Sequence, residues 1–149
     1  MDRLLDLEPE LSSPEYRYGL NTPSANVFLL CSTHGAISNG GLHYFFEVAH
    51  PGTPPYDLIA DVYRHIGSPK TADCISEAAK AFPFTDPHLK PDQRLDKLTQ
   101  LEEKLEPGEG AFDHLDDILF HEQDMNAQIL KYMRKHIASL PHGRGPEIV

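Results

Sequence analysis

Carboxylates are the most concentrated reactive side chains in this sequence of 149 residues. The chain holds 23 acidic and 13 basic side chains, which gives a formal net charge of −10 with histidine neutral. The excess is concentrated in residues 91–126, with eleven acids and three bases, whereas residues 127–149 carry four bases and one acid. A net negative protein repels nucleic-acid phosphates and attracts basic proteins, so we expect a protein partner and no direct binding of nucleic acid.

Seven closely spaced acids are the candidate residues for contact with that basic partner. Apolar residues, including Leu101, Leu105 and Phe112, are interspersed among these acids. This pattern predicts amphipathic helices with the acids on the outer face. A carboxylate array spaced like phosphates would attract the Lys and Arg side chains that normally bind DNA. The alternative interpretation is a solvated face that only maintains solubility. The seven candidates are Glu102, Glu103, Glu106, Glu109, Asp113, Asp116 and Asp117.

The best local candidate for a metal site is formed by His43, Glu47 and His50. Their i, i+4, i+7 spacing would place all three side chains on one face of a single helix. Glu47 and His50 also have the Glu-x-x-His form of di-iron bundles, but such sites need a second copy, which this sequence does not contain. Polar residues at a helix end are the alternative. We expect no metal, and a metal-binding enzyme remains the least favoured hypothesis.

Nucleophilic catalysis has little support in the sequence. Cys31 and His34 are three residues apart, within helical reach, but Cys31 ends the apolar run 27–31, and burial raises a thiol pKa. His121 and Glu122 lack the second histidine of a zinc-protease HExxH motif. No GxSxG motif, phosphate-binding glycine loop or CxxC pair occurs. We therefore expect a protein that is not an enzyme and binds no cofactor.

The elements that must position these residues are predicted to be helices. Proline follows Thr22, Thr53 and Ser68, a helix-start signal, so we expect helices to begin near residues 23, 54 and 69, and a fourth near Pro91. Apolar residues recur at helical spacing, as in the stripe Leu95, Leu98, Leu101 and Leu105 and in Ile129, Leu130, Met133, Ile137 and Leu140. No segment alternates like a strand. The sequence predicts an all-α protein, one compact domain of about seven short-to-medium helices.

We expect three segments along the chain. Residues 1–20 are predicted to form a partly helical N-terminal extension, 21–140 the helical domain, and 141–149 a flexible tail. The longest purely apolar run is five residues, far short of the roughly 20 of a membrane-spanning helix, so we expect no membrane association. The N-terminus is acidic where a signal peptide is basic and apolar, which favours a cytoplasmic location.

The segment Ile37–Phe46 is the most distinctive part of the sequence. A helix is predicted to end at Asn39-Gly40-Gly41, because asparagine and glycine tolerate a left-handed cap, and Tyr44, Phe45 and Phe46 are expected in the core. This resembles the NGG-x-x-x-FF signature of a bacterial all-helical family typified by an acidic DNA-mimic protein. Further similar segments follow in the same order between residues 24 and 138, namely 66–72, 78–83, 115–117 and 129–133.

The resemblance implies an all-helical fold and a function as a binding protein. The typical member is a dimer whose surface acids imitate phosphates and which binds a helix-turn-helix transcription factor, so a homodimer is a possibility for this chain. We expect a non-enzymatic acidic protein that occupies and inhibits the basic surface of a DNA-binding regulator. The alternative is an immunity or antitoxin protein that neutralises a bacterial toxin, since some members of the family look like immunity proteins.

Overall fold

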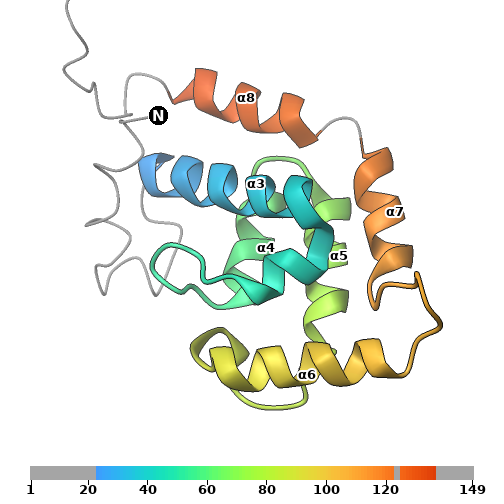
Figure 1. The fold of residues 1–149 in the computed structure, drawn as a ribbon. Helices are drawn as coiled ribbons and strands as arrows, with labels where there is room; N and C mark the ends of the chain where they lie inside the picture. Colours follow the sequence, from blue (N-terminus) through green and yellow to red (C-terminus); the bar gives the residue numbers. More distant parts are fainter. Residues whose placement is uncertain (1–22, 123–124, 137–149) are drawn as a thin grey trace, which may run out of the picture.

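A computed structural model describes residues 23–122 and 125–136 (Figure 1). These residues form six α-helices and one short 3-10 helix, and no strand occurs among them. The prediction of an all-α, single-domain protein is confirmed, and the number of helices is close to the seven expected. The predicted N-terminal extension (1–20) and tail (141–149) lie outside the described residues, as do Ile137 and Leu140 of the predicted apolar stripe.

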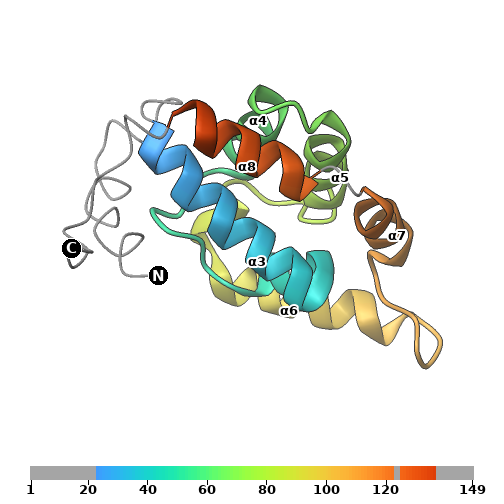
Figure 2. The same cartoon turned by 90° about the horizontal axis from the view of Figure 1, so that it is seen from above.

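The helices follow one another with short connections. Their bounds are α3 (Pro23–Glu47), α4 (Tyr56–His65), α5 (Pro69–Ala79), the 3-10 helix η2 (Pro87–Leu89), α6 (Pro91–Glu103), α7 (Asp113–His121) and α8 (Met125–Lys135). α3 packs against α4, α6, α7 and α8, and α4 packs along α5. Figures 1 and 2 both show α6 and α8 on opposite sides of α3. None of the described helices is long and apolar enough to cross a membrane.

Proline marks the helix starts as predicted, although the capping mechanism is different. α3, α5 and α6 each begin with proline, while α4 begins at Tyr56, two residues after the expected position. Ser68 precedes α5, but its hydroxyl makes no capping hydrogen bond and has no partner among the described residues. Thr53 adopts a left-handed backbone in the preceding turn, with φ 44°, instead of capping α4. The fixed φ of proline is therefore sufficient to start α5 without a hydroxyl cap.

The predicted break at the glycine pair is present inside α3. Gly40 and Gly41 have non-helical backbone angles, so the element consists of two helices that meet there. Figure 1 shows the ribbon changing direction at this point. Gly41 has φ 65°, a conformation that residues with a side chain rarely adopt. Because of this break, the second helix directs Phe45 and Phe46 into the centre of the protein.

An aromatic cluster around Phe46 forms the centre of the core. The Phe46 ring centroid lies 4.9 Å from those of Tyr56 and Phe82 and 5.5 Å from that of Phe112, which joins four segments of the chain. Phe45 and Phe46 are completely buried. The expectation that Tyr44 is a core residue is wrong, since Tyr44 is 38% exposed on the outer side of its short helix.

Two leucines of the predicted apolar stripes also lie outside the core. Leu95 on α6 is 42% exposed and Leu130 on α8 is 50% exposed, whereas Arg94 and Ile129, which directly precede them, are buried. Each helix packs on α3 through one narrow face, so a residue next to a buried position along the sequence points about 100° away from that face.

Candidate functional site: the acidic face of α6 and α7

The seven acidic candidates lie on one continuous stretch of the fold, which we call the acidic ridge. Glu102 and Glu103 occupy the last turn of α6, Glu106 and Glu109 lie in the connecting loop, and the three aspartates belong to α7. In Figure 1 this stretch runs from the right end of α6 through the loop to α7. Six of the seven residues are exposed, and Asp116 is half-buried. Six of the seven acids therefore lie on the outer surface, as the amphipathic pattern predicts, and Asp116 does not.

Two carboxylates of the acidic ridge shape the loop between α6 and α7. Glu109 Oε2 accepts a hydrogen bond from the Glu106 backbone N–H at 3.3 Å, and Asp113 Oδ2 accepts one from the Gly110 N–H at 2.7 Å. Gly108, with φ 90°, supplies the turn between them. These hydrogen bonds to backbone N–H groups hold the carboxylates of Glu109 and Asp113 in place.

Histidine 43 connects the acidic ridge to α3. Its Nδ1 lies 3.4 Å from Glu102 Oε1, and its Nε2 lies 3.7 Å from Glu47 Oε2. The predicted pairing of His43 with Glu47 on one helix face is therefore present. Glu102 is therefore the residue of the acidic ridge that His43 links to α3.

Three acids of the ridge have carboxylates with no internal partner. Within the described residues, Glu103, Glu106 and Asp117 make no side-chain hydrogen bond or ion pair. Lys104 lies between them in the sequence, but its ammonium group also forms no ion pair with a described residue. The negative charge of these three side chains is thus available to a partner.

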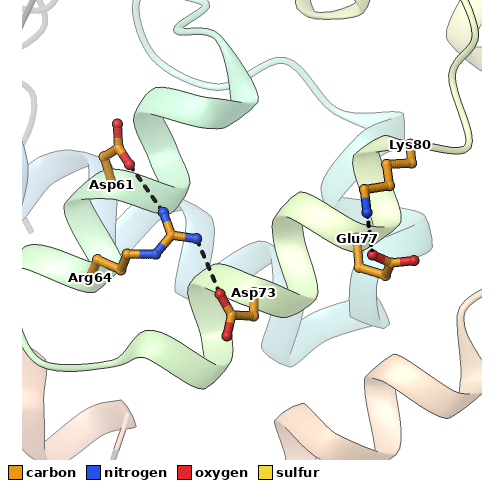
Figure 3. A network of polar contacts seen from close by, with 5 residues as sticks. All are labelled: Asp61, Arg64, Asp73, Glu77 and Lys80. Carbon is orange, nitrogen blue, oxygen red and sulfur yellow. Dashed lines mark hydrogen bonds and ion pairs between the residues drawn. The ribbon is translucent and has the colours of Figure 1, made fainter.

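The acids of α4 and α5 have a different arrangement, which Figure 3 shows. Arg64 donates hydrogen bonds of 3.1 Å to Asp61 Oδ1 and to Asp73 Oδ1, and so links the two helices. Lys80 Nζ lies 2.8 Å from Glu77 Oε2 on α5. On this surface each of these acids has a basic partner, whereas the acidic ridge has none for its outermost carboxylates. The acids that Arg64 and Lys80 pair thus differ from the outermost carboxylates of the acidic ridge, which have no basic partner among the described residues.

Asp116 occupies a different position from the other predicted partner-binding residues. Its Oδ1 accepts a hydrogen bond of 2.8 Å from the backbone N–H of Leu42, the first residue after the glycine break in α3. A side chain at position 41 would place a Cβ atom 2.7 Å from Asp116 Oδ2. Burial raises the pKa of Asp116, while the hydrogen bond from Leu42 lowers it. Asp116 thus caps the second helix of α3 and attaches α7 to it.

The structure contradicts the idea that His43, Glu47 and His50 share one helix face. α3 ends at Glu47, and His50 lies in the following loop, where its Nε2 is 2.8 Å from the Phe45 carbonyl oxygen. The His50 ring packs on that of Phe45 at 4.5 Å. Burial lowers the pKa of His50 to about 4, helped by the charge of Arg94 and opposed by the hydrogen bond to Phe45. Across residues 23–122 and 125–136, no three His, Cys, Asp or Glu side chains are arranged to hold a metal ion.

Cys31 and His34, whose spacing allows a pair that the sequence analysis disfavours, form no hydrogen bond with each other. Burial raises the pKa of the Cys31 thiol, as the sequence indicated. His34 Nδ1 is buried without a hydrogen-bond partner in the described part of the chain, so it does not accept a proton from Cys31. This arrangement offers no activated thiolate.

Arg94 is the structurally important residue that the sequence reasoning missed. It is only 2% exposed, and its Nε and Nη1 donate hydrogen bonds to the carbonyl oxygens of Phe46 at 2.9 Å and Pro87 at 2.7 Å. A cation here interacts favourably with the carbonyl end of α3. The sequence contained a signal, because Arg94 lies four residues before Leu98 and seven before Leu101, on the apolar face of α6.

Short helices around an aromatic core, with unpaired carboxylates on one side, define an acidic all-helical protein. The family model described as DMP19-like protein, where DMP19 stands for DNA mimic protein 19, matches residues 19–136. The chain therefore belongs to the DMP19-like family. Searches of curated proteins and of solved structures returned no match.

Proposed function

We propose that this protein binds a DNA-binding protein through the acidic ridge and blocks its contact with DNA. Membership of a family named for a DNA mimic supports this class of function. A DNA mimic acts as a binding protein, and catalysis has no role in the proposal. The partner would present Lys and Arg side chains that otherwise contact phosphates.

The observation that carries the proposal is the contrast between two acidic surfaces of the same molecule. Asp61, Asp73 and Glu77 are paired with Arg64 and Lys80, so three of the four acids on α4 and α5 have a basic partner, and Asp57 is the exception. The carboxylates of Glu103, Glu106 and Asp117 are exposed and have no partner within residues 23–122 and 125–136. If the acids served only to increase solubility, the two surfaces would have no reason to differ.

The hydrogen bonds that fix the loop between α6 and α7 also support the proposal. Glu109 and Asp113 are held by backbone N–H groups, so part of the acidic ridge is arranged before a partner arrives. Preorganised charges lose less side-chain entropy on binding than mobile ones. Complementary charge would accelerate association, and specificity would come from the shape of the ridge and a few buried contacts. Asp116 is left out of this binding surface because its carboxylate caps α3.

A pair of triple variants tests the proposal with a matched charge control. The ridge variant carries Glu103→Gln, Glu106→Gln and Asp117→Asn, and the control carries Asp61→Asn, Asp73→Asn and Glu77→Gln. Both remove three negative charges. We would capture partners from a lysate of the native host, purify the captured protein, and measure its binding to DNA by fluorescence anisotropy with each form as competitor.

The wild type and the control should displace DNA, and the ridge variant should do so about tenfold less well, because each exposed charge pair contributes roughly 0.2–1 kcal/mol. The difference should shrink as salt is raised. Equal weakening of both variants would mean that only net charge matters, and a captured protein whose DNA binding is unaffected would contradict the proposal.

A further inference from the structure

A cleft of about 410 Å³ lies away from the acidic ridge and is not explained by the proposed function. It is enclosed by the start of α4, the last turn of α5 and the segment 82–88, which includes η2. Its volume is within the range of small-ligand sites, about 300–1,000 Å³. No residue of the acidic ridge contributes to its walls.

Aromatic rings form the walls of the cleft. Tyr56 and Phe82 are each 5% exposed and are held by Phe46, at 4.9 Å in both cases. The Phe84 ring lies 6.1 Å from that of Phe82, and the His88 ring lies 6.4 Å from that of Tyr56. Because two of the four rings belong to the core, the walls are rigid, and aromatic rings attract cations.

Phe84 already accepts a cation from the chain itself. Lys90 Nζ lies 5.9 Å from the centroid of the Phe84 ring and donates a hydrogen bond to the Thr85 hydroxyl and another to its carbonyl oxygen. This contact shows that the electrostatic environment of the ring tolerates a positive group nearby. Lys90 itself does not line the cleft.

The charged groups at the rim favour a cationic occupant. The carboxylates of Asp57 and Asp86 are exposed and form no ion pair or hydrogen bond with a described side chain or backbone group. Lys80 also lines the cleft, but its ammonium group is 2.8 Å from Glu77 Oε2, which neutralises it. The last turn of α5 adds the negative end of a helix dipole, and Asp57 offsets the positive end of α4.

We propose that this cleft binds an arginine side chain presented by a partner protein or peptide. A guanidinium group is planar, stacks on aromatic rings and pairs with carboxylates, so it matches both the walls and the rim. A purely apolar occupant would cover Asp57 and Asp86 without providing them with partners, which is unfavourable. The proposal does not depend on the acidic ridge, and the two can be tested separately.

A titration of the full-length chain with three small probes tests the chemistry. N-acetyl-arginine-N-methylamide is added to isotope-labelled protein and followed by amide NMR, beside the citrulline and norleucine analogues. The arginine probe should give saturable shifts at residues 56–57 and at the residues of 82–88 other than Pro83 and Pro87, which have no amide proton. Citrulline has the same shape without the charge and should bind more weakly, and norleucine should bind least. Equal shifts with norleucine, or no saturable shift with arginine, would overturn the proposal.

Variants at the rim of the cleft show whether the carboxylates of Asp57 and Asp86 contribute to binding of the arginine probe. Asp57→Asn with Asp86→Asn should lower the affinity for the arginine probe about two- to thirtyfold, the range expected for two exposed charge pairs. Asparagine also tolerates the left-handed backbone at position 86, where φ is 50°, so the fold is preserved. The single variant Asp57→Asn is a second form that leaves that turn untouched.

A second variant of the acidic ridge, with only Glu103→Gln and Glu106→Gln, is the control and should bind the arginine probe like the wild type. Equal affinity of the rim double variant and this control would contradict the cleft as an arginine site. Loss of DNA-binding partners in the control, with arginine binding intact, would show that the two surfaces act independently.

Discussion

Single side chains in this protein hold segments together that are far apart in the sequence. Arg94 joins α6 to the end of α3 and to η2, and Asp116 joins α7 to the middle of α3. Both are charged residues that a composition count assigns to the surface. Their positions have a structural purpose, because each satisfies backbone groups that a helix end or break leaves without a partner.

Replacement of Arg94 tests whether its hydrogen bonds to the backbone stabilise the fold. Arg94→Met would leave the carbonyl oxygens of Phe46 and Pro87 buried without donors, and we expect a loss of about 3 kcal/mol in the free energy of unfolding. Urea denaturation followed by circular dichroism measures it. The control is Arg64→Met, which removes two exposed ion pairs and should cost less than about 2 kcal/mol. Similar losses for both variants would mean that Arg94 is not the anchor described above.

The glycine break in α3 is the decisive feature at the scale of the elements. Gly41→Ala would place a Cβ atom 2.7 Å from Asp116 Oδ2 on a backbone with φ 65°, so we expect a loss of about 2 kcal/mol or more. Gly35→Ala is the matched change in the same helix, where a Cβ atom meets nothing within 4 Å, and it should stabilise by about 0.5–1 kcal/mol. Thermal unfolding of both variants measures whether stability is lost in Gly41→Ala and gained in Gly35→Ala. If Gly41→Ala were also stabilising, the link to Asp116 would be unimportant.

The helices could be predicted largely from the sequence, because proline and glycine mark local backbone choices that do not depend on distant residues. The starts of α3, α5 and α6 and the break at Gly40 and Gly41 are examples. The roles of Arg94 and Asp116 could not be predicted in this way, since their partners are 48 and 74 residues away in the chain. The placement of His50 on the same helix as Glu47 is wrong because residue spacing alone does not show where a helix ends. The helix α3 ends at Glu47, and His50 lies in the loop that follows.

Stability should depend on pH at the scale of the whole molecule. Burial lowers the pKa of His50 to about 4, below the value of about 6.5 in an unfolded chain. The unfolded state therefore binds the proton first, and stability that is present above pH 6.5 is lost as the pH falls toward 4, up to about 3 kcal/mol. The lowered pKa of His88 acts in the same direction, and the raised pKa of Asp116 opposes it at the acidic end.

Urea denaturation between pH 7 and 4.5 measures this effect. His50→Phe should flatten the dependence of stability on pH, whatever its effect on absolute stability at pH 7. His65→Gln, which removes an exposed histidine, is the comparison variant. An unchanged slope in His50→Phe would assign the acid sensitivity to another group.

The positions of α6, α7 and α8 have a consequence for how the molecule moves before any contact is made. The exposed bases Lys131, Arg134 and Lys135 lie on the part of α8 that is remote from α7, and Figures 1 and 2 both show this end beside the start of α3. The described part of the molecule thus carries negative charge at its α6–α7 end and positive charge at this end of α8. In the field of a positively charged surface it would rotate so that the α6–α7 end leads and α8 trails. A larger fraction of collisions would then begin in the productive orientation, and low ionic strength would strengthen this alignment.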